Sequence, residues 1–150
     1  GVARSPFSDR DAAHLVDVHD LIRGVLDLNW LAVIYGLIFV VAATVGRAWQ
    51  LAARCMILGS VLTIAVLGLL GLLSLLDWDA LFLRFHFVSF SNDLWRLDPS
   101  RDALIRLYPT DFFMDATVQM AAMSVAEALL LAVLAVLFLR RGTMAKRRTW

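Results

Sequence analysis

Residues 55–76 read CMILGSVLTIAVLGLLGLLSLL and contain no charged side chain. A helix needs roughly 20 apolar residues to cross the hydrocarbon layer of a bilayer, and inside lipid every backbone N–H and C=O must be paired within a helix or a closed barrel. Because the run is long and rich in leucine, it predicts a membrane-spanning helix rather than a barrel strand. Within it, Gly59, Ser60, Gly68 and Gly71 are small enough to let a neighbouring helix pack closely.

Two more apolar runs flank this one, at residues 28–46 and 119–139. Trp30 and Tyr35 lie toward the start of the first run, where aromatic interface anchors are common. Over the 150 residues, hydrophobic side chains make up 61% and charged ones 18%, compared with about half and a quarter in soluble domains. The sequence therefore predicts an all-α polytopic membrane protein with three transmembrane helices, folded as a single membrane domain over residues 1–150.

The third run contains one ionisable residue, Glu127, near its middle. Such a residue costs a few kcal/mol in a membrane span unless it is paired, hydrated or protonated. We therefore expect Glu127 to face the interior of the bundle. It would be either a polar partner in a substrate cavity or a protonated group bonded to Ser60 or Thr63.

Charges are segregated along the chain, and this segregation predicts the topology. The connector RAWQLAAR at 47–54 carries only arginines, and the tail at 140–150 carries five cationic residues, so both are expected in the cytoplasm by the positive-inside rule. Residues 77–118 hold seven aspartates and four arginines, and residues 1–27 hold five aspartates and three arginines. These two acidic segments are expected on the opposite, extracytoplasmic side.

Residues 1–27 are expected to form an outer amphipathic helix. Ser8, followed three residues later by Asp11, is a helix-start signal that places the first turn near Asp9. Apolar residues then recur at three- and four-residue steps, which predicts a helix with one apolar stripe at the membrane surface. The stripe consists of Leu15, Val18, Ile22 and Val25.

Residues 77–118 are expected to form a small outer cap. The alternation of Phe85, Phe87 and Ser89 with their neighbours favours a short extended segment. The pair Asp98–Pro99 indicates a helix that starts there and runs about two turns to Leu107. The chain then restarts as a helix at Pro109 and Thr110 and continues into the third span. An aromatic belt at the headgroup level is expected from Trp95, Phe112 and Phe113.

Three histidines, His14, His19 and His86, lie in the two outer segments. Histidine is the usual general acid or base near neutral pH, although histidines at a membrane interface can also be ordinary amphipathic surface residues. His14 and His19 are five residues apart and point about 140° away from each other on a helix, which excludes a zinc-type pair between them.

Two polar residues could support such a site. Asp17 shares a helix face with His14 and could orient its ring, or it could be a surface acid paired with Arg10 or Arg23. Asn92, followed by Asp93, could stabilise a turn or donate to a developing oxyanion. For each of these two residues, both roles stay open at this point.

The sequence lacks the motifs that usually accompany several kinds of chemistry. The sequence has no His-Glu-x-x-His, no Gly-x-Ser-x-Gly and no phosphate-binding glycine loop, and Cys55 is its only cysteine. Metal, serine-hydrolase and nucleotide chemistry are therefore disfavoured, and we expect no metal, no cofactor and no nucleic-acid partner.

Two stretches of the sequence resemble the lipoprotein intramolecular transacylase family. The first is FSDRDAAHLVDV at 7–18, with a histidine followed by x-x-Asp-Val. The second is FHFVSFSNDLWRLDPSRDALIRLYPTDFF at 85–113, where Phe-His, Asn-Asp-x-Trp, Asp-Pro and Pro-x-x-Phe-Phe occur in that order. The resemblance covers both outer segments and the spans between them.

This resemblance implies a bacterial cytoplasmic membrane enzyme. Its reaction would move an acyl chain from the diacylglyceryl group of a lipoprotein's N-terminal cysteine to the α-amino group of that cysteine, which gives a lyso-form lipoprotein. The partners would be the diacylated lipoprotein and membrane lipid. On the motif match, His14 and His86 correspond to the family's two functional histidines, and His19 has no counterpart. Family members have a further membrane helix ahead of the first motif, so a fourth, N-terminal span missing from this chain is expected.

Two other functions remain compatible with the residues alone. A non-enzymatic membrane assembly or transport accessory could hold a partner through the aromatic residues of the outer loop. A related membrane acyltransferase or lipid hydrolase could use the same histidines on another ester.

Overall fold

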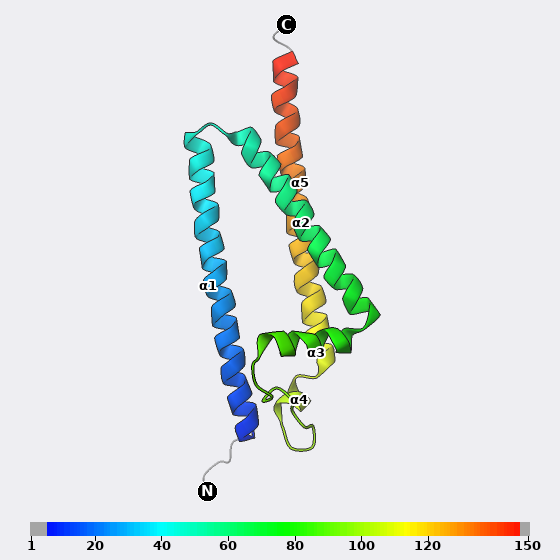
Figure 1. Cartoon of the computed structure of the whole chain (residues 1–150). Helices are drawn as coiled ribbons and strands as arrows, with labels where there is room; N and C mark the ends of the chain where they lie inside the picture. Colours follow the sequence, from blue (N-terminus) through cyan, green and yellow to red (C-terminus); the bar gives the residue numbers. More distant parts are fainter. Residues whose placement is uncertain (1–5, 148–150) are drawn as a thin grey trace. The chain divides into compact units, whose positions relative to one another are not determined.

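The computed structural model describes residues 6–147, and within that range it contains α-helices and no β-strand. The five helices are α1 (Asp9–Val45), α2 (Trp49–Leu76), α3 (Trp78–Ser89), α4 (Leu104–Leu107) and α5 (Thr110–Arg147) (Figure 1). Three of them, α1, α2 and α5, are long and apolar enough to cross a membrane. The predicted all-helical membrane class with three spanning helices is therefore confirmed.

Helix α1 begins where the sequence predicts. The backbone N–H of Asp11 donates to the Ser8 hydroxyl oxygen, and the backbone N–H of Ser8 donates to the Asp11 carboxylate, each over 3.0 Å. These reciprocal bonds satisfy donors that a helix start otherwise leaves unpaired. The outer helix and the first span form one continuous helix, because no proline interrupts residues 9–45. At about 1.5 Å per residue this helix is roughly 55 Å long, so only its uncharged part, from residue 28 onward, is needed to span the hydrocarbon.

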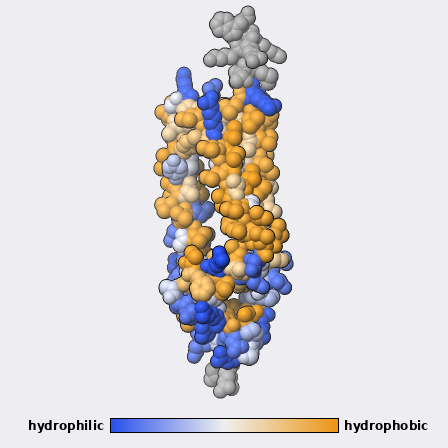
Figure 2. All heavy atoms as spheres, turned by 45° about the vertical axis from the view of Figure 1, so that its right-hand side comes forward, coloured by the Kyte–Doolittle hydropathy of each residue, from blue (hydrophilic) through white to orange (hydrophobic). Residues whose placement is uncertain are grey.

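The chain divides into two compact units. The first contains the chain up to Leu31 and from Leu73 to Thr117, and the second contains Ala32–Leu72 and the chain from Val118 onward. Large apolar side chains on the spanning helices are widely exposed, for example Tyr35 at 72% and Leu58 at 70%. Figure 2 shows apolar side chains over most of the length of the long helices and hydrophilic ones toward their ends. This exposed apolar surface suits contact with lipid.

Small residues form the buried core of the second unit. Ala43, Ala52, Ala53, Ser60, Ala128 and Ala135 are buried there. Ser60 therefore fits the packing role expected from sequence. The glycines do not, since a Cβ built on Gly59, Gly68 or Gly71 would meet no atom within 4 Å in the described part of the chain.

The expected position of Glu127 is also wrong. Its side chain is exposed on α5 rather than directed into a packed interior. An apolar cavity of about 350 Å³ does lie within the second unit, lined by Leu62, Thr63, Val66, Leu67 and Ser124, and Glu127 is not among its lining residues.

Helix α3 corrects the prediction of an extended segment over residues 85–90. Its N-cap is Asp77, whose carboxylate accepts the Ala80 backbone N–H over 2.9 Å. From Trp78 the aromatic rings recur every four residues, with Trp78 and Phe82 at 5.9 Å and Phe82 and His86 at 4.4 Å between ring centroids. This four-residue stacking needs a helix, because side chains at i and i+4 lie on one helix face.

The helix predicted from Asp98 to Leu107 is shorter than expected. Residues 98–102 form a turn in which the Asp98 carboxylate accepts both the backbone N–H and the hydroxyl of Ser100. Only Leu104–Leu107 is helical. The Asp98 N–H donates to the Asp102 carboxylate over 2.7 Å, so side-chain acceptors replace the early helical turn. Helix α5 then begins at Thr110, as the sequence predicts.

Candidate active site

One polar stripe of α1 carries the first half of the candidate site. Arg10, His14, Asp17 and Leu21 are spaced by three or four residues and therefore lie on one helix face, with Asp11 beside them. Each polar member of this stripe contacts residues 86–104 of the same unit, here called the outer segment. The stripe is thus the surface on which the outer segment docks.

Asp11 holds the outer segment through a fully buried carboxylate. Its exposed fraction is 0%, and it accepts the backbone N–H groups of Ala103 over 2.9 Å and of Leu104 over 3.3 Å. Burial by itself raises the pKa of Asp11, but the N–H donors of Ser8, Ala103 and Leu104 outweigh it and bring the pKa below its ordinary value of 3.8. Asp11 therefore stays ionised and caps α4, whose own N-cap residue, Ala103, has no side chain able to do so.

Two more contacts fasten the same segment. The Arg10 guanidinium donates through Nε to the Leu94 carbonyl over 3.3 Å, and through Nη2 to the Asp93 carbonyl. The Ser8 hydroxyl donates to the buried carboxylate of Asp102 over 2.7 Å. The segment is therefore attached to the start of α1 at two places, near residue 94 and near residue 103.

The structure brings His14 and His86 together. Their ring centroids are 6.1 Å apart, and the rings are tilted by 35°. Both side chains are buried, with exposed fractions of 6% for His14 and 9% for His86. His14 comes from α1 and His86 from α3, so two distant parts of the sequence supply one pair of imidazoles.

His86 has a defined tautomer. Its Nδ1 lies 2.8 Å from the carbonyl oxygen of Phe82, and because a carbonyl oxygen only accepts, Nδ1 carries the proton. In the neutral ring, Nε2 is then the nitrogen with the free lone pair. The rings of Phe82, Phe85, Phe90 and Trp95 surround this imidazole, at centroid distances of 4.4, 5.4, 5.7 and 5.1 Å respectively.

His14 differs from His86 in its hydrogen bonding. Its Nδ1 is buried and has no hydrogen-bond partner within the described residues. Burial lowers the pKa of His14 below its ordinary value of 6.5, and the neighbouring His86 lowers it further, while the carboxylates of Asp17 and Asp11 act in the opposite direction. His14 is therefore neutral at physiological pH and able to accept a proton.

Asp17 and Asn92 bind each other. The Asn92 amide donates to Asp17 Oδ2 over 2.9 Å, and Asn92 Oδ1 accepts the Leu94 backbone N–H over 2.9 Å. No hydrogen bond joins Asp17 to His14 among the described residues, so the expected orientation of the ring by Asp17 is not observed. Asp17 acts on His14 through its charge alone. Asn92 combines the turn role with a bond to α1.

The third histidine lies outside this arrangement. His19 is exposed, and its Nδ1 lies 3.1 Å from Asp20 Oδ1. Among the described residues, the ring of His19 makes no contact with the rings of His14 and His86. No group of three or more potential metal ligands occurs in residues 6–147.

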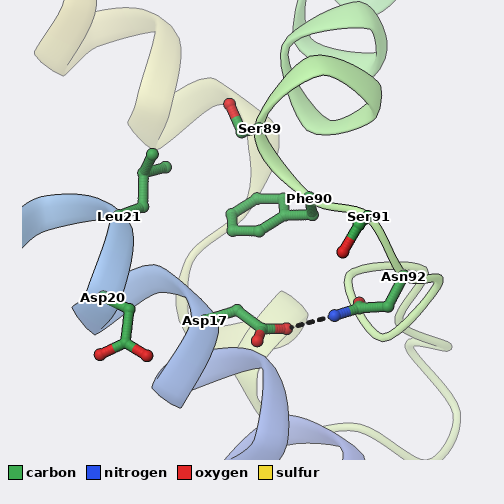
Figure 3. Close-up of a pocket in the computed structure, with 7 residues that line it drawn as sticks. All are labelled: Asp17, Asp20, Leu21, Ser89, Phe90, Ser91 and Asn92. Carbon is green, nitrogen blue, oxygen red and sulfur yellow. Dashed lines mark hydrogen bonds between the residues drawn. The ribbon is translucent and has the colours of Figure 1, made fainter. Parts of the chain in front are cut away.

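A small pocket is linked to the two buried histidines through the ring of Phe90. It has a volume of about 200 Å³ and is lined by Asp17, Asp20, Leu21, Ser89, Phe90, Ser91 and Asn92 (Figure 3). Its wall residue Phe90 lies against His14, with ring centroids 5.1 Å apart and nearly perpendicular planes. The same ring is 5.7 Å from His86, so Phe90 is shared between the pocket and the histidine pair.

Sequence reasoning missed the anchoring roles of Arg10, Asp11 and Asp102. For Asp11 the available signal was the helix cap, which explains one of its carboxylate contacts but not the two across the unit. Trp95, whose place in an aromatic belt stays a prediction, lies against His86, and its ring also lies beneath the Arg96 guanidinium at 5.1 Å.

Comparison with known proteins gives one result. The family model described as "Lipoprotein intramolecular transacylase Lit" matches residues 2–113. The match includes both histidines of the pair and all the anchoring residues described above. A search of the curated proteins and a search of the solved structures returned no match.

Proposed function

The chain belongs to the lipoprotein intramolecular transacylase family, and from this premise we propose that it transfers an acyl chain within the lipid anchor of a bacterial lipoprotein. The acyl group leaves the diacylglyceryl group of the N-terminal cysteine and joins the α-amino nitrogen of the same cysteine, which gives the lyso form. The observation that carries this proposal is the pair of buried imidazoles, 6.1 Å apart, supplied by α1 and α3.

The chemistry requires proton transfer at two positions. The α-ammonium group must first lose a proton so that its nitrogen can attack the ester carbonyl carbon. A second proton leaves this nitrogen as the amide forms, and the glyceryl oxygen takes up one proton as its bond to the carbonyl carbon breaks. In total, one proton is released to solvent.

The two histidines suit different steps of this scheme. His14 is neutral, and its Nδ1 has no hydrogen-bond partner among the residues that the structure describes, so we assign it as the base that takes the proton from the attacking nitrogen. His86 is held by its Nδ1 bond to Phe82, which leaves Nε2 for the proton that reaches the glyceryl oxygen. The aromatic rings around His86 exclude water, which strengthens electrostatic interactions in the site.

The proposed location follows from the charge pattern and the three spanning helices. We place the protein in the bacterial cytoplasmic membrane as one multi-pass domain, with residues 1–27 and 77–118 on the extracytoplasmic side and the basic tail at 140–150 in the cytoplasm. The histidine pair then lies on the side where lipoproteins display their lipidated N-terminus, with the diacylated lipoprotein as partner.

The test is replacement of each histidine, with mass spectrometry of the N-terminal lipopeptide of a lipoprotein produced in the same cells. His14→Ala and His86→Ala should each lower conversion to the lyso form by about 10²- to 10⁴-fold, the usual contribution of a general acid or base. His19→Ala is the matched control, since His19 is exposed and its ring contacts neither His14 nor His86 within the described part of the chain, and it should retain conversion.

The products also separate the alternatives. An N-acylated peptide with one glyceryl chain supports the transacylase, whereas free fatty acid indicates a lipid hydrolase. Full conversion by a folded His14→Ala protein would contradict the role assigned to His14. Neither product from the wild-type protein would favour a non-enzymatic membrane accessory.

A further inference from the structure

The pocket beside the histidine pair has a size suited to a head group rather than to a lipid chain. Its volume of about 200 Å³ lies below the range of roughly 300–1,000 Å³ that holds a drug-sized molecule. It corresponds to about six or seven water volumes. A whole diacylated peptide does not fit in it, but the polar end of one does.

The chemistry of the lining favours a cation. Of the seven lining residues, Asp17 and Asp20 are acidic, Ser89, Ser91 and Asn92 are neutral polar, and none is lysine, arginine or histidine. Within the described residues, no hydrogen bond engages the hydroxyls of Ser89 and Ser91. Figure 3 shows the Ser91 hydroxyl and the Asp17 carboxylate on the same side of the Phe90 ring. The pocket thus offers acceptor oxygens and an uncompensated negative charge.

Asp17 is the better placed of the two carboxylates. The Asn92 amide holds its Oδ2 over 2.9 Å, which fixes the side chain and leaves Oδ1 available. The carboxylate of Asp20 points away from Phe90 in Figure 3 and lies 3.1 Å from His19 Nδ1. Asp20 therefore contributes charge from a distance, and Asp17 is the contact residue.

The position of the pocket connects it to the chemistry. Phe90 forms part of its wall, and the same ring packs against both His14 and His86. A group held beside Asp17 is therefore separated from the two imidazoles by the edge of one aromatic ring. The pocket would hold the ammonium form before the chemical step, and the nitrogen must pass the Phe90 ring to come within hydrogen-bond reach of His14.

We propose that this pocket binds the α-ammonium group of the substrate's N-terminal cysteine, with the Asp17 carboxylate and the Ser91 hydroxyl as acceptors and with Asn92 as the residue that positions Asp17. The inference rests on the proposed function, because it assigns one part of that substrate to one part of the site. It adds a recognition element outside the histidine pair, which selects a free amino terminus over a blocked one. An ammonium group has three donors and suits a cluster of oxygen acceptors.

Binding measurements with non-reactive ligands test this inference. The two probes are synthetic dialkylglyceryl-cysteinyl peptides with ether-linked chains, which cannot transfer an acyl group, one with a free α-amine and one with an N-acetyl group. For the full chain in nanodiscs, we expect the free-amine ligand to bind about tenfold more tightly than the acetylated one, which corresponds to about 1.4 kcal/mol.

Three variants locate the effect. Asp17→Asn keeps an oxygen that can accept the Asn92 amide but removes the charge, so it should abolish most of the tenfold preference. Ser91→Ala, at an exposed loop position, should reduce the preference by about threefold, since a neutral hydrogen bond contributes less than a charged one. Asp27→Asn is the matched control, an exposed acid of the same helix outside the pocket, and it should leave the preference unchanged.

The outcomes separate this inference from the proposed function. Equal affinity for the two probes, or a full preference retained in Asp17→Asn, overturns the ammonium site even if the wild-type protein produces lyso-form lipoprotein. The opposite combination is also informative. If Asp17→Asn loses the preference while the wild-type protein produces no lyso form from a reactive substrate, the ammonium site is supported and the transacylase is contradicted.

Discussion

His14 and His86 belong to the same type of residue but have different surroundings. His86 is held by a backbone carbonyl and enclosed by four aromatic rings, whereas the buried Nδ1 of His14 has no partner among the described residues. Burial, one neighbouring imidazole and two nearby carboxylates together set the pKa of His14. These three influences can be separated by substitution because each has a known sign.

The first prediction concerns the titration of His14. Burial places its pKa below 6.5 in the wild-type protein. Asp17 raises this pKa, so Asp17→Asn should lower it further, and His86 lowers it, so His86→Gln should raise it. The measurement is an NMR pH titration of ring-labelled histidine in micelles, with the His14 signal assigned by its loss in His14→Gln. Asp27→Asn should leave the titration unchanged. A His14 pKa above 6.5, or an upward shift in Asp17→Asn, would contradict the geometry described here.

The same shift has a consequence for stability. Because the folded state binds a proton at His14 more weakly than the unfolded chain does, stability from this group is present above pH 6.5 and is lost as the pH falls through the folded-state pKa. Acidification should therefore loosen the outer segment around α1.

At the residue scale, the sequence was informative about which side chains matter and less so about what they contact. The motif match pointed to both histidines, the helix face shared with His14 pointed to Asp17, and turn or oxyanion chemistry pointed to Asn92. The structure places all four in one unit. The contact of Asp17 with Asn92 instead of His14 was not predictable, because it depends on where a loop 75 residues away lies. The exposure of Glu127 likewise depends on tertiary packing that a linear pattern does not contain.

Helices α1, α3 and α4 are linked by contacts that cross large sequence distances. Helix α4 has four residues and no side-chain cap of its own. It forms where the carboxylate of Asp11 in α1 accepts the backbone N–H groups at the start of α4. Isolated helices of this length are unstable in water. The outer segment thus depends on α1 for its local structure.

The second prediction follows from this dependence. Asp11→Ala leaves the N–H groups of Ser8, Ala103 and Leu104 without their acceptor in a buried place, which should lower the free energy of unfolding by about 3 kcal/mol. The melting temperature in detergent should fall by roughly 10 °C. Asp9→Ala, an exposed acid in the same helical turn, should shift the melting temperature by at most a third of that. Equal shifts in the two variants would mean that Asp11 does not hold the outer segment.

Among the elements, the predicted helices are observed where a long apolar run or the Ser8 cap marked them, but not at the cap expected at Asp98. The start near Asp9, the three spanning helices and the start at Thr110 are observed. The extended segment at 85–90 was wrong because six alternating residues fit a strand as well as a short piece of helix, and only the aromatic spacing from Trp78 distinguishes them. Asp98 and Pro99 form a turn because Asp102 binds the Asp98 N–H, a bond that sequence alone does not predict.

For the molecule as a whole, the exposed apolar surface of α1, α2 and α5 requires a membrane. The proposed direction of insertion rests on charge, because arginines and lysines resist translocation more than aspartates do. The proposed transacylation needs the outer segment on the same side as the lipid anchor of the lipoprotein.

The third prediction is therefore one of topology. In a background where Cys55 is replaced by serine, a cysteine at Ser100 in the outer loop should react in intact cells with a membrane-impermeant maleimide. A cysteine at Gln50, within the basic connector and in the first turn of α2, should react only after the membrane is permeabilised. Both positions are exposed, so a difference in labelling reports the side of the membrane. The opposite labelling pattern would place the histidine pair in the cytoplasm and contradict the proposed reaction.

Arg10 and Asp11 hold the outer segment through its backbone, at the carbonyls of Asp93 and Leu94 and at the amides of Ala103 and Leu104. Because these bonds use only backbone atoms of the outer segment, they do not depend on the side chains of the residues that are held. Position 93, whose side chain is exposed, can therefore change identity during evolution or engineering without loss of the attachment. Proline at 103 or 104 is the exception, because it has no N–H to donate, and a mutational scan of this loop should find those two positions intolerant of that one residue.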